Sequence, residues 1–427
     1  MRRWGQSVTA VLLSLRVARS FTSFRTTRDV QMVSTIQVDE CDEATDSTAN
    51  VTGADKDAGD ADESVVEMSE VEMQALPKTF RLSMPKESCL STVERQQLTR
   101  MIFETHYAPE GAGKEDRAMW YQSALEVQWL EEWAFSDGEK DKDEARRAVK
   151  KAVLQRVDLH KPLAYIIGHQ PFYGCNIKCS PPLLCPRPET EMWTHWYVSN
   201  YLNRSASTGG GQRSALRVLD MCCGTGCIGI AIATHVPHAE VVAVDIMDES
   251  VRAADENARL NGLDSRRYRV IKSDMFEAFL VKDSHNDSDV GRLNEEGVSG
   301  KRRLEEQHIG SFDVVVANPP YVLPEQYVNL PPGIKLWESK LALVGDAKRE
   351  QQQYLYFQEL CELGAAVLKP KTQRNTALVN APNLIIEVGL QAERVASIME
   401  RSDLWEEVSV HLDYAQQPRW ISANSTH

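Results

Sequence analysis

The 427-residue chain has no run of 18 apolar residues and no excess of positive charge, and both absences narrow its function. A membrane-spanning helix needs about 20 consecutive apolar residues, so the sequence predicts no transmembrane segment. The formal net charge is −14, of which residues 1–72 carry −7 and residues 73–427 carry the other −7. An acidic body argues against affinity that rests on neutralising many phosphates. No direct contact with nucleic acid is therefore expected.

The nine cysteines lack the repeated Cys-x-x-Cys spacings of a zinc site. Their odd number fits reduced thiols in an intracellular compartment. Three of them, Cys175, Cys179 and Cys185, cluster in the sequence. They lie among strand-forming residues and prolines, however, at spacings that do not suit metal ligands. We therefore expect no metal site in this protein.

The first 28 residues are basic, with six arginines and no acid among serines, threonines and short apolar clusters. This composition is typical of an organelle-import presequence, so a targeting segment is predicted over residues 1–30. A secretory signal is a rival interpretation, but the apolar stretch 8–15 is short and Arg16 follows it. A basic tail without a targeting role is the third. The mitochondrion is the expected destination and a plastid is the alternative, since their presequences overlap in composition.

Two segments are predicted to be disordered. Residues 39–72 hold thirteen acids and one lysine, and we expect an acidic linker over residues 31–86. So few large apolar side chains cannot offset the entropy that is lost on ordering. Residues 283–310 are polar, charged and glycine-containing, and they predict a disordered insertion before a buried strand.

Three stretches with apolar residues at helical spacing predict a small helical bundle over residues 87–161. The first of them starts with a capping box at Ser91–Glu94. No catalytic constellation appears in the bundle, so its functional role would be to hold a partner. Two β-rich runs on either side of residues 168–171 predict a β-hairpin over residues 162–186 that links the bundle to the rest of the chain.

A strand, a glycine-containing turn and an apolar helix follow from residue 216. Asp220 precedes the turn, and the glycines of Gly224–Gly226 let the backbone approach a ligand. The next strand ends in Asp245, where nucleotide-binding folds hydrogen-bond ribose hydroxyls. Asp274 and Met275 follow a third strand, where an adenine base would lie. The complete Gly-x-Gly-x-x-Gly pattern of dinucleotide enzymes is missing, which favours S-adenosyl-L-methionine instead.

The strand Phe312–Ala317 ends in Asn318-Pro319-Pro320-Tyr321. Its β-branched residues suit a buried parallel strand, and the two prolines end the ladder. The amide oxygen of Asn318 and the carbonyl of Pro319 offer two acceptors to a planar NH2 group, with Tyr321 as an aromatic wall. Orienting an NH2 group towards a sulfonium electrophile requires neither a metal nor a strong base. A proline-rich turn without function is the alternative.

The segment Pro186–Glu191 is a rigid entry to a helix that is predicted to begin near Thr190. Arg187, Thr190 and Glu191 lie close to the helix N-terminus, where they could face a charged ligand. They could equally serve as capping residues and a surface ion pair. From here to the end of the chain helices and strands alternate, which predicts the α/β class.

With these motifs in this order, residues 88–425 resemble the HemK/PrmC family, the peptide chain release factor N5-glutamine methyltransferases. The resemblance implies a Rossmann-like, seven-stranded class I methyltransferase domain over residues 187–427, preceded by the helical bundle and the hairpin. The segments that carry it are Pro162–Gly168, Arg187–Glu191, Asp220–Ile228, Val244–Asp245, Asn318–Tyr321, Glu338–Val344 and Asp413–Arg419.

The family resemblance also implies an activity. S-adenosyl-L-methionine would donate a methyl group to the side-chain amide nitrogen of the glutamine in the Gly-Gly-Gln motif of a class I peptide chain release factor. The bundle over residues 87–161 would help to dock that partner, and a monomer is expected. Asn318 and Pro319 would grip the amide, and Pro320 and Tyr321 would line its pocket.

The residues for the cofactor follow from the same resemblance. Asp245 would hold the ribose and Met275, with Asp274, would lie at the adenine. Cys222 stands where bacterial members usually have glycine, and Met275 where an aromatic residue is common. These departures put the tightness of cofactor binding in question more than its identity. The loop with Asp220 would consist of Cys222, Cys223, Gly224, Thr225 and Gly226.

Two other functions fit parts of the same pattern. An adenine-N6 methyltransferase acting on RNA or DNA would use Asn318–Tyr321 equally well, because an exocyclic amine presents the same planar NH2. It would, however, call for a basic surface or a target-recognition domain. In a non-catalytic assembly factor with this fold, we would expect the pocket residues to be replaced. Transfer of a methyl group to a release factor, to adenine or to neither separates the three.

Overall fold

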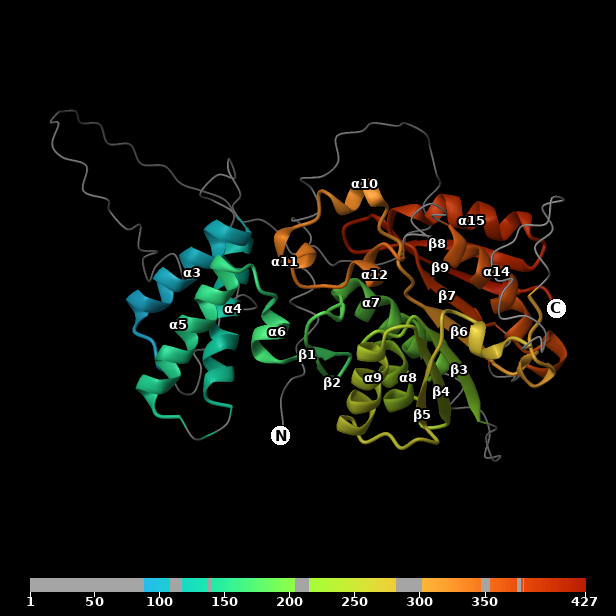
Figure 1. The fold of residues 1–427 in the computed structure, drawn as a ribbon, viewed down its shortest axis with the longest axis horizontal. Coiled ribbons are helices and arrows are strands. Elements are labelled where there is room, and N and C mark those ends of the chain that lie inside the picture. Colours follow the sequence, from blue (N-terminus) through green and yellow to red (C-terminus); the bar gives the residue numbers. More distant parts are fainter. Residues whose placement is uncertain are drawn as a thin grey trace, which may run out of the picture. The chain divides into compact units, whose positions relative to one another are not determined.

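The computed structural model describes residues 88–107, 117–136, 138, 140–203, 215–281, 302–346, 354–374, 378 and 380–427. The predicted presequence and acidic linker lie outside these residues. The described residues belong to one compact unit. Within it a helical bundle is followed by a β-hairpin and then by a large mixed sheet with helices on both faces (Figure 1).

The bundle consists of three helices, α3 (Thr92–His106), α4 (Arg117–Ala134) and α5 (Lys142–Asp158). The predicted capping box is confirmed, because the Ser91 side chain accepts a hydrogen bond from the Glu94 amide and Glu94 caps the Ser91 amide in return. A core of buried side chains holds the helices together; it includes Leu98, Ile102, Val127, Leu130, Val149 and Val153.

The linking hairpin is present, but its predicted turn is wrong. The first apolar run forms a short helix, α6 (Leu163–Ile167), that ends at Gly168, whose φ of 91° suits a helix C-terminus. The strands are β1 (His169–Phe172) and β2 (Cys175–Lys178), which pair antiparallel. The turn therefore lies after Phe172 and not at residues 168–171. Helix α7 (Pro188–Tyr197) follows and continues as a π-helical turn (Val198–Leu202).

The large sheet has seven strands in the order β5-β4-β3-β6-β7-β9-β8. The first five in this order run parallel, whereas β9 is antiparallel to both of its neighbours. This is the Rossmann-like, seven-stranded sheet that the family resemblance implied, and it is mixed. Its strands are β3 (Leu216–Met221), β4 (Ala239–Asp245), β5 (Tyr268–Lys272), β6 (Val314–Ala317), β7 (Leu384–Glu387), β8 (Trp405–Leu412) and β9 (Pro418–Ser425).

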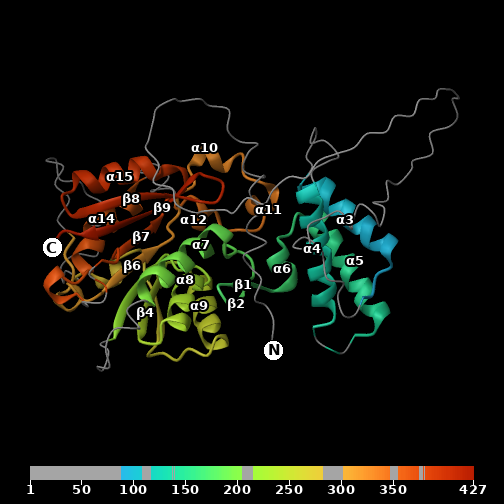
Figure 2. The same cartoon turned by 180° about the vertical axis from the view of Figure 1, so that it is seen from behind.

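Helices cover both faces of the sheet. Alternate residues of a strand point to opposite faces, so each strand contributes side chains to both cores. Val314 and Val316 of β6 join the core formed with α7, α8 (Cys227–His235) and α9 (Asp248–Leu260). Val315 and Ala317 join the core formed with α14 (Leu355–Val367) and α15 (Ala392–Arg401). Figure 2 shows α15 beside β8 and β9, and α8 and α9 beside β4. Strand β6 is thus buried on both faces, as its β-branched composition predicts.

Three short helices follow β6, namely α10 (Pro324–Tyr327), α11 (Pro332–Lys335) and α12 (Lys340–Leu343). Before β6, the predicted disordered insertion extends too far. Leu304 forms a β-bridge with Leu280, and Glu306–His308 form a 3-10 helix, so residues 302–310 are ordered. Residues 282–301 lie outside the described part of the chain. No helix among the described residues is both long and apolar enough to cross a membrane.

Candidate active site

The carboxyl ends of the parallel strands are level with one another at one edge of the sheet. Met221 of β3 pairs with Val244 of β4 and with Ala317 of β6, and Asp245 pairs with Lys272 of β5. The chain runs from β3 to β4 on one side and later to β6 on the other, so the topological switch point lies between β3 and β6. Ligands of open α/β sheets bind at such a point. The predicted residues at this edge are Cys222, Asp245, Asp274 and Asn318.

The turn after β3 owes its shape to residues with positive φ. Cys222, Gly224 and Gly226 have φ values of 58°, 54° and 80°. A Cβ atom at Gly226 would lie 2.6 Å from the Tyr268 hydroxyl, so only glycine fits between the turn and β5. A Cβ atom at Gly224 would meet no atom of the structure within 4 Å. The turn is therefore packed tightly at Gly226 and open at Gly224, while Cys223 and Thr225 are buried.

Asp220 and Asp245 hold this turn and helix α8, which follows it. Asp220 is fully buried, and its Oδ2 accepts a hydrogen bond from the Gly229 amide (2.9 Å), whereas Oδ1 has no partner among the described residues. Burial raises the pKa of Asp220 from 3.8 to about 7. Asp245 accepts from the amides of Gly224 (2.8 Å) and Met247 (2.9 Å). Asp245 is half-buried as a residue, and burial of its carboxyl group raises the pKa.

The residues after β5 contact the turn after β3. Met275 is 3% exposed and has a φ of 47°, and the Cys222 thiol donates to its sulfur over 3.5 Å. Asp274 is half-buried beside it. The structure therefore brings Asp274 and Met275 next to the turn at Cys222, and the Met275 side chain is buried against the Cys222 thiol.

Asn318 stands at the end of β6 with a free side chain. It is half-buried, and neither its amide nor the carbonyl of Pro319 hydrogen-bonds to another described residue. Pro319 is buried and Pro320 half-buried. An amide that is partly shielded from water and has no internal partner can orient a ligand. The two acceptors expected from the sequence thus have no hydrogen-bond partner among the described residues.

Tyr321, in contrast, is firmly held. Its hydroxyl donates to Glu387 Oε1 (2.9 Å) and accepts from Arg419 (3.4 Å). Its ring packs on Gly389, where a Cβ atom would lie 2.8 Å from two ring carbons. Burial, followed by the charge of Glu387, raises the pKa of Tyr321. The phenol therefore stays protonated, and it is the ring that remains to line the site.

The residues at the start of α7 have partners within the protein. Arg187 forms an ion pair with Glu338 (2.5 Å), and Glu191 accepts a hydrogen bond from the Tyr173 amide (2.8 Å). The Thr190 hydroxyl donates to Glu387 (2.7 Å). The three side chains thus point to three different partners. The sequence analysis did not identify these partners. Glu387 was the available signal, because an acid at the end of a buried apolar strand needs hydrogen-bond partners.

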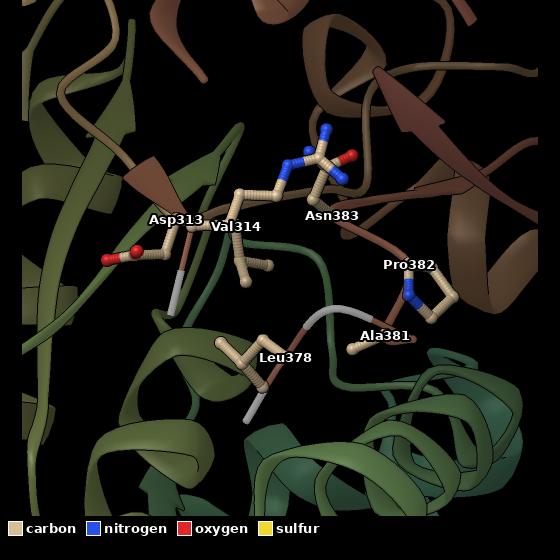
Figure 3. Close-up of a pocket in the computed structure, with 7 residues that line it drawn as sticks. Asp313, Val314, Leu378, Ala381, Pro382 and Asn383 are labelled. Atoms are coloured by element: carbon tan, nitrogen blue, oxygen red, sulfur yellow. The ribbon is translucent and has the colours of Figure 1, made fainter. Parts of the chain in front are cut away.

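A small cavity lies away from this site, beside the amino ends of β6 and β7 (Figure 3). Asp313 precedes β6 and Asn383 precedes β7, so the cavity is at the opposite edge of the sheet. The Asp313 carboxylate is held there by Lys369 (2.8 Å). The lining residues are Asp313, Val314, Arg374, Leu378, Ala381, Pro382 and Asn383. Among the described residues no three histidine, cysteine or acidic side chains are grouped as metal ligands.

Comparison with known proteins identifies the part of the chain that carries this edge of the sheet. A family model described as a methyltransferase domain matches residues 212–332, which include the turn after β3 and Asn318–Tyr321. The N-terminal domain of human METTL16 in complex with SAH aligns over 66% of this chain and 82% of its own, at 16% identity and a TM-score of 0.32. That likeness is too distant to bear on function.

The cofactor of the domain is S-adenosyl-L-methionine, and the residues at the edge of the sheet fit it. The open space beside Gly224 lets a ligand approach the backbone of the turn. Asp245 is half-buried at the end of β4, the place where nucleotide-binding folds hold ribose hydroxyls. The domain is therefore a methyltransferase domain that depends on this cofactor.

The curated relatives specify the family. The release factor glutamine methyltransferase of Thermodesulfovibrio yellowstonii is 30% identical over 247 residues, which are 55% of this chain and 74% of the relative. The human MTRF1L release factor glutamine methyltransferase is 26% identical over 63% of this chain and 67% of its own length. The enzyme of Flavobacterium psychrophilum is 28% identical, and the chain spans 64% of its length. On this similarity the chain belongs to the release factor glutamine methyltransferase family.

Proposed function

We propose that this protein methylates the side-chain amide nitrogen (N5) of the glutamine in the Gly-Gly-Gln motif of a class I peptide chain release factor. The observation that carries the proposal is the unpaired amide of Asn318 beside the free carbonyl of Pro319, at the switch point of a methyltransferase domain. The names of the relatives support the choice of substrate.

The chemistry explains why two acceptors suffice. An amide nitrogen is a poor nucleophile because its lone pair is delocalised into the carbonyl. Asn318 Oδ1 and the Pro319 carbonyl would each accept one hydrogen of the substrate NH2 and so fix its orientation and oppose that delocalisation. The cofactor supplies an electrophilic methyl group on a sulfonium. The ring of Tyr321 would form the wall of the amide pocket.

The same edge of the sheet would hold the cofactor. Asp245 would accept the ribose hydroxyls, and Asp274 and Met275 would lie at the adenine. Asp220 would hold the start of α8, directly after the turn, through the Gly229 amide. The turn itself, which would carry the backbone contacts, is formed by Cys222, Cys223, Gly224, Thr225 and Gly226.

The helical bundle is proposed to help dock the release factor. It contacts the segment that follows the Asn-Pro-Pro-Tyr turn, because the Trp337 indole donates to the Leu159 carbonyl (2.8 Å) and Lys161 lies over the Trp337 ring. The acidic body supports a protein partner over nucleic acid. A mitochondrial location, or a plastid as the alternative, rests on the basic composition of residues 1–28.

A transfer assay with the full chain, S-adenosyl-L-methionine and organellar release factors tests the proposal, with peptide mass spectrometry to locate the methyl group. We expect the methyl group on the Gly-Gly-Gln glutamine. Asn318→Ala is expected to lower kcat by about 100-fold or more, with cofactor affinity retained, because positioning of the amide is lost. Asn329→Ala, at an exposed asparagine beyond the turn, is the matched control.

Other outcomes would point elsewhere. Methylation of adenine in nucleic acid, without transfer to any release factor, would establish the adenine-N6 activity instead. Cofactor binding without any transfer would favour the non-catalytic assembly factor. Equal loss of cofactor binding and transfer in Asn318→Ala would mean that Asn318 is needed for the fold of the site and does not act on the substrate.

A further inference from the structure

We propose that Glu387 is a positioning residue that fixes the ring of Tyr321, and with it the wall of the amide pocket, through a buried carboxylate. The inference rests on the proposed function and names a further residue for it. Glu387 is the last residue of β7 and is 0% exposed. Ile386 pairs with Ala317, so Glu387 lies next to the point where β6 ends and Asn318 begins.

Both carboxylate oxygens of Glu387 are used. Oε1 accepts from the Tyr321 hydroxyl (2.9 Å), and Oε2 accepts from Thr190 Oγ1 (2.7 Å) and from Trp193 Nε1 (2.9 Å). A buried carboxylate is tolerated only when hydrogen bonds satisfy it in this way. One side chain therefore connects β7, helix α7 and the turn that carries Asn318.

The hydroxyl of Tyr321 lies between two charged side chains, those of Arg419 and Glu387. Arg419 donates to it from one side (3.4 Å) and is itself paired with Asp413 (3.1 Å). Glu387 accepts from it on the other side. Glu189 also faces Arg419, and its carboxylate accepts from Tyr414 (2.8 Å). The Tyr321 hydroxyl is thus held from both sides, by Arg419 as a donor and by Glu387 as an acceptor.

The ring is fixed at its face as well as at its hydroxyl. Gly389 has a φ of 52°, and a Cβ atom there would lie 2.8 Å from Cδ2 and Cε2 of Tyr321. A tyrosine side chain has two rotatable torsions. The contact at Gly389 and the hydrogen bond to Glu387 together restrain both. Without Glu387 the ring can rotate away from the site, and an amide held 1 Å out of place reacts far more slowly.

Kinetics and ring order together test the inference. Glu387→Gln is expected to lower kcat about 10- to 100-fold, with the Kd of S-adenosyl-L-methionine unchanged. In fluorotyrosine-labelled protein, the fluorine signal that disappears in Tyr321→Phe is expected to shift and broaden in Glu387→Gln. Trp193→Phe removes a different donor from the same carboxylate. It is the matched control, and we expect it to lower thermal stability while changing kcat and the Tyr321 signal less.

The outcomes separate this inference from the proposed function. A wild-type protein that methylates no release factor overturns the proposed function, and the ring-order measurement still decides the role of Glu387. A wild-type protein that methylates the release factor, together with an unchanged Tyr321 signal and an unchanged kcat in Glu387→Gln, overturns the inference alone. A fall in kcat that follows the loss of thermal stability equally in Glu387→Gln and Trp193→Phe would also overturn it.

Discussion

The thiol of Cys222 lies 3.5 Å from the sulfur of Met275, and both residues have a positive φ. The contact joins the turn after β3 to the segment after β5. It also joins the two positions at which the family resemblance implies a departure from bacterial members, which would have glycine and an aromatic residue there. We infer that the departures compensate each other, because the thiol occupies space that a larger side chain at position 275 would need.

A double-mutant cycle on cofactor affinity checks this compensation. Cys222→Gly removes the thiol and Met275→Phe introduces a ring against it, and each alone is expected to raise the Kd of S-adenosyl-L-methionine. The double variant is expected to bind more tightly than either single variant, because contacting residues are coupled by roughly 0.5–3 kcal/mol. Calorimetric Kd values for the four proteins measure the coupling. Additive effects would show that the two sulfurs act independently.

The two glycines of the turn are expected to respond differently to a methyl group. Gly226→Ala places a Cβ 2.6 Å from the Tyr268 hydroxyl at a φ of 80°, so it should destabilise the fold by well over the ~1 kcal/mol of the backbone strain alone. Gly224→Ala meets no atom within 4 Å, so it should cost only about that strain, yet it fills the space left for the cofactor. Thermal unfolding without cofactor and Kd measurements separate the two. Equal loss of stability would contradict the prediction.

Asp220 is expected to make stability fall as pH rises. In the folded protein its carboxyl keeps a proton up to a pKa of about 7, whereas the unfolded chain releases it near 3.8. Between these values the folded state binds more protons, so the unfolding free energy decreases with pH by at most on the order of 4 kcal/mol. Cys223, Cys227 and Tyr268 beside it have pKa values raised further above neutrality and stay uncharged in this range.

The variant Asp220→Asn isolates this contribution. An asparagine can still accept from the Gly229 amide but has no charge to bury. The difference in unfolding free energy between the variant and the wild type, followed by urea denaturation from pH 4 to pH 8, should shift in favour of the variant up to about pH 7 and then level off. A difference that does not vary with pH would show that Asp220 stays ionised throughout.

Local patterns in the sequence were sufficient to predict several of the strands and the residues at their ends. The valines before Asn318 indicate a strand buried on both faces, and the glycines between Asp220 and Asp245 indicate the turn at the switch point. The hairpin turn was misplaced because Leu163–Ile167 is a five-residue apolar run, and periodicity cannot distinguish a helix from a strand at that length. Pro162 before it and Gly168 after it were the signals of a helix.

Long-range partners, by contrast, could not be read from the sequence. Thr190 and Tyr321 are 131 positions apart, yet both donate to Glu387. Each of them has an ordinary local interpretation, as a helix-capping residue and as the end of a turn. Their convergence depends on the register of β6 and β7 and on the packing of α7. The order of parallel strands is fixed by such tertiary packing, and no local signal encodes it.

The ion pair of Arg187 and Glu338 is expected to make the stability of an Arg187 variant depend on pH. It ties the start of α7 to the segment after the Asn-Pro-Pro-Tyr turn, and the Glu338 side chain is only 1% exposed. Removing the cation with Arg187→Met leaves a buried charge without its partner, which costs about 3–5 kcal/mol. Burial already raises the pKa of Glu338, and Arg187 opposes that shift.

Without Arg187, the pKa of Glu338 in the folded protein rises further, while its value in the unfolded chain does not change. The folded variant therefore takes up a proton that the unfolded chain releases, and its stability increases as pH falls towards the unfolded value. Arg187→Met should thus lose more stability at pH 8 than at pH 5, relative to the wild type. Arg187→Met combined with Glu338→Leu removes the charge and should lose this pH dependence. Arg187→Met could instead lose the same unfolding free energy, relative to the wild type, at both pH values. That result would mean that water reaches Glu338 when Arg187 is absent. The ion pair would then not be what excludes water at the start of α7.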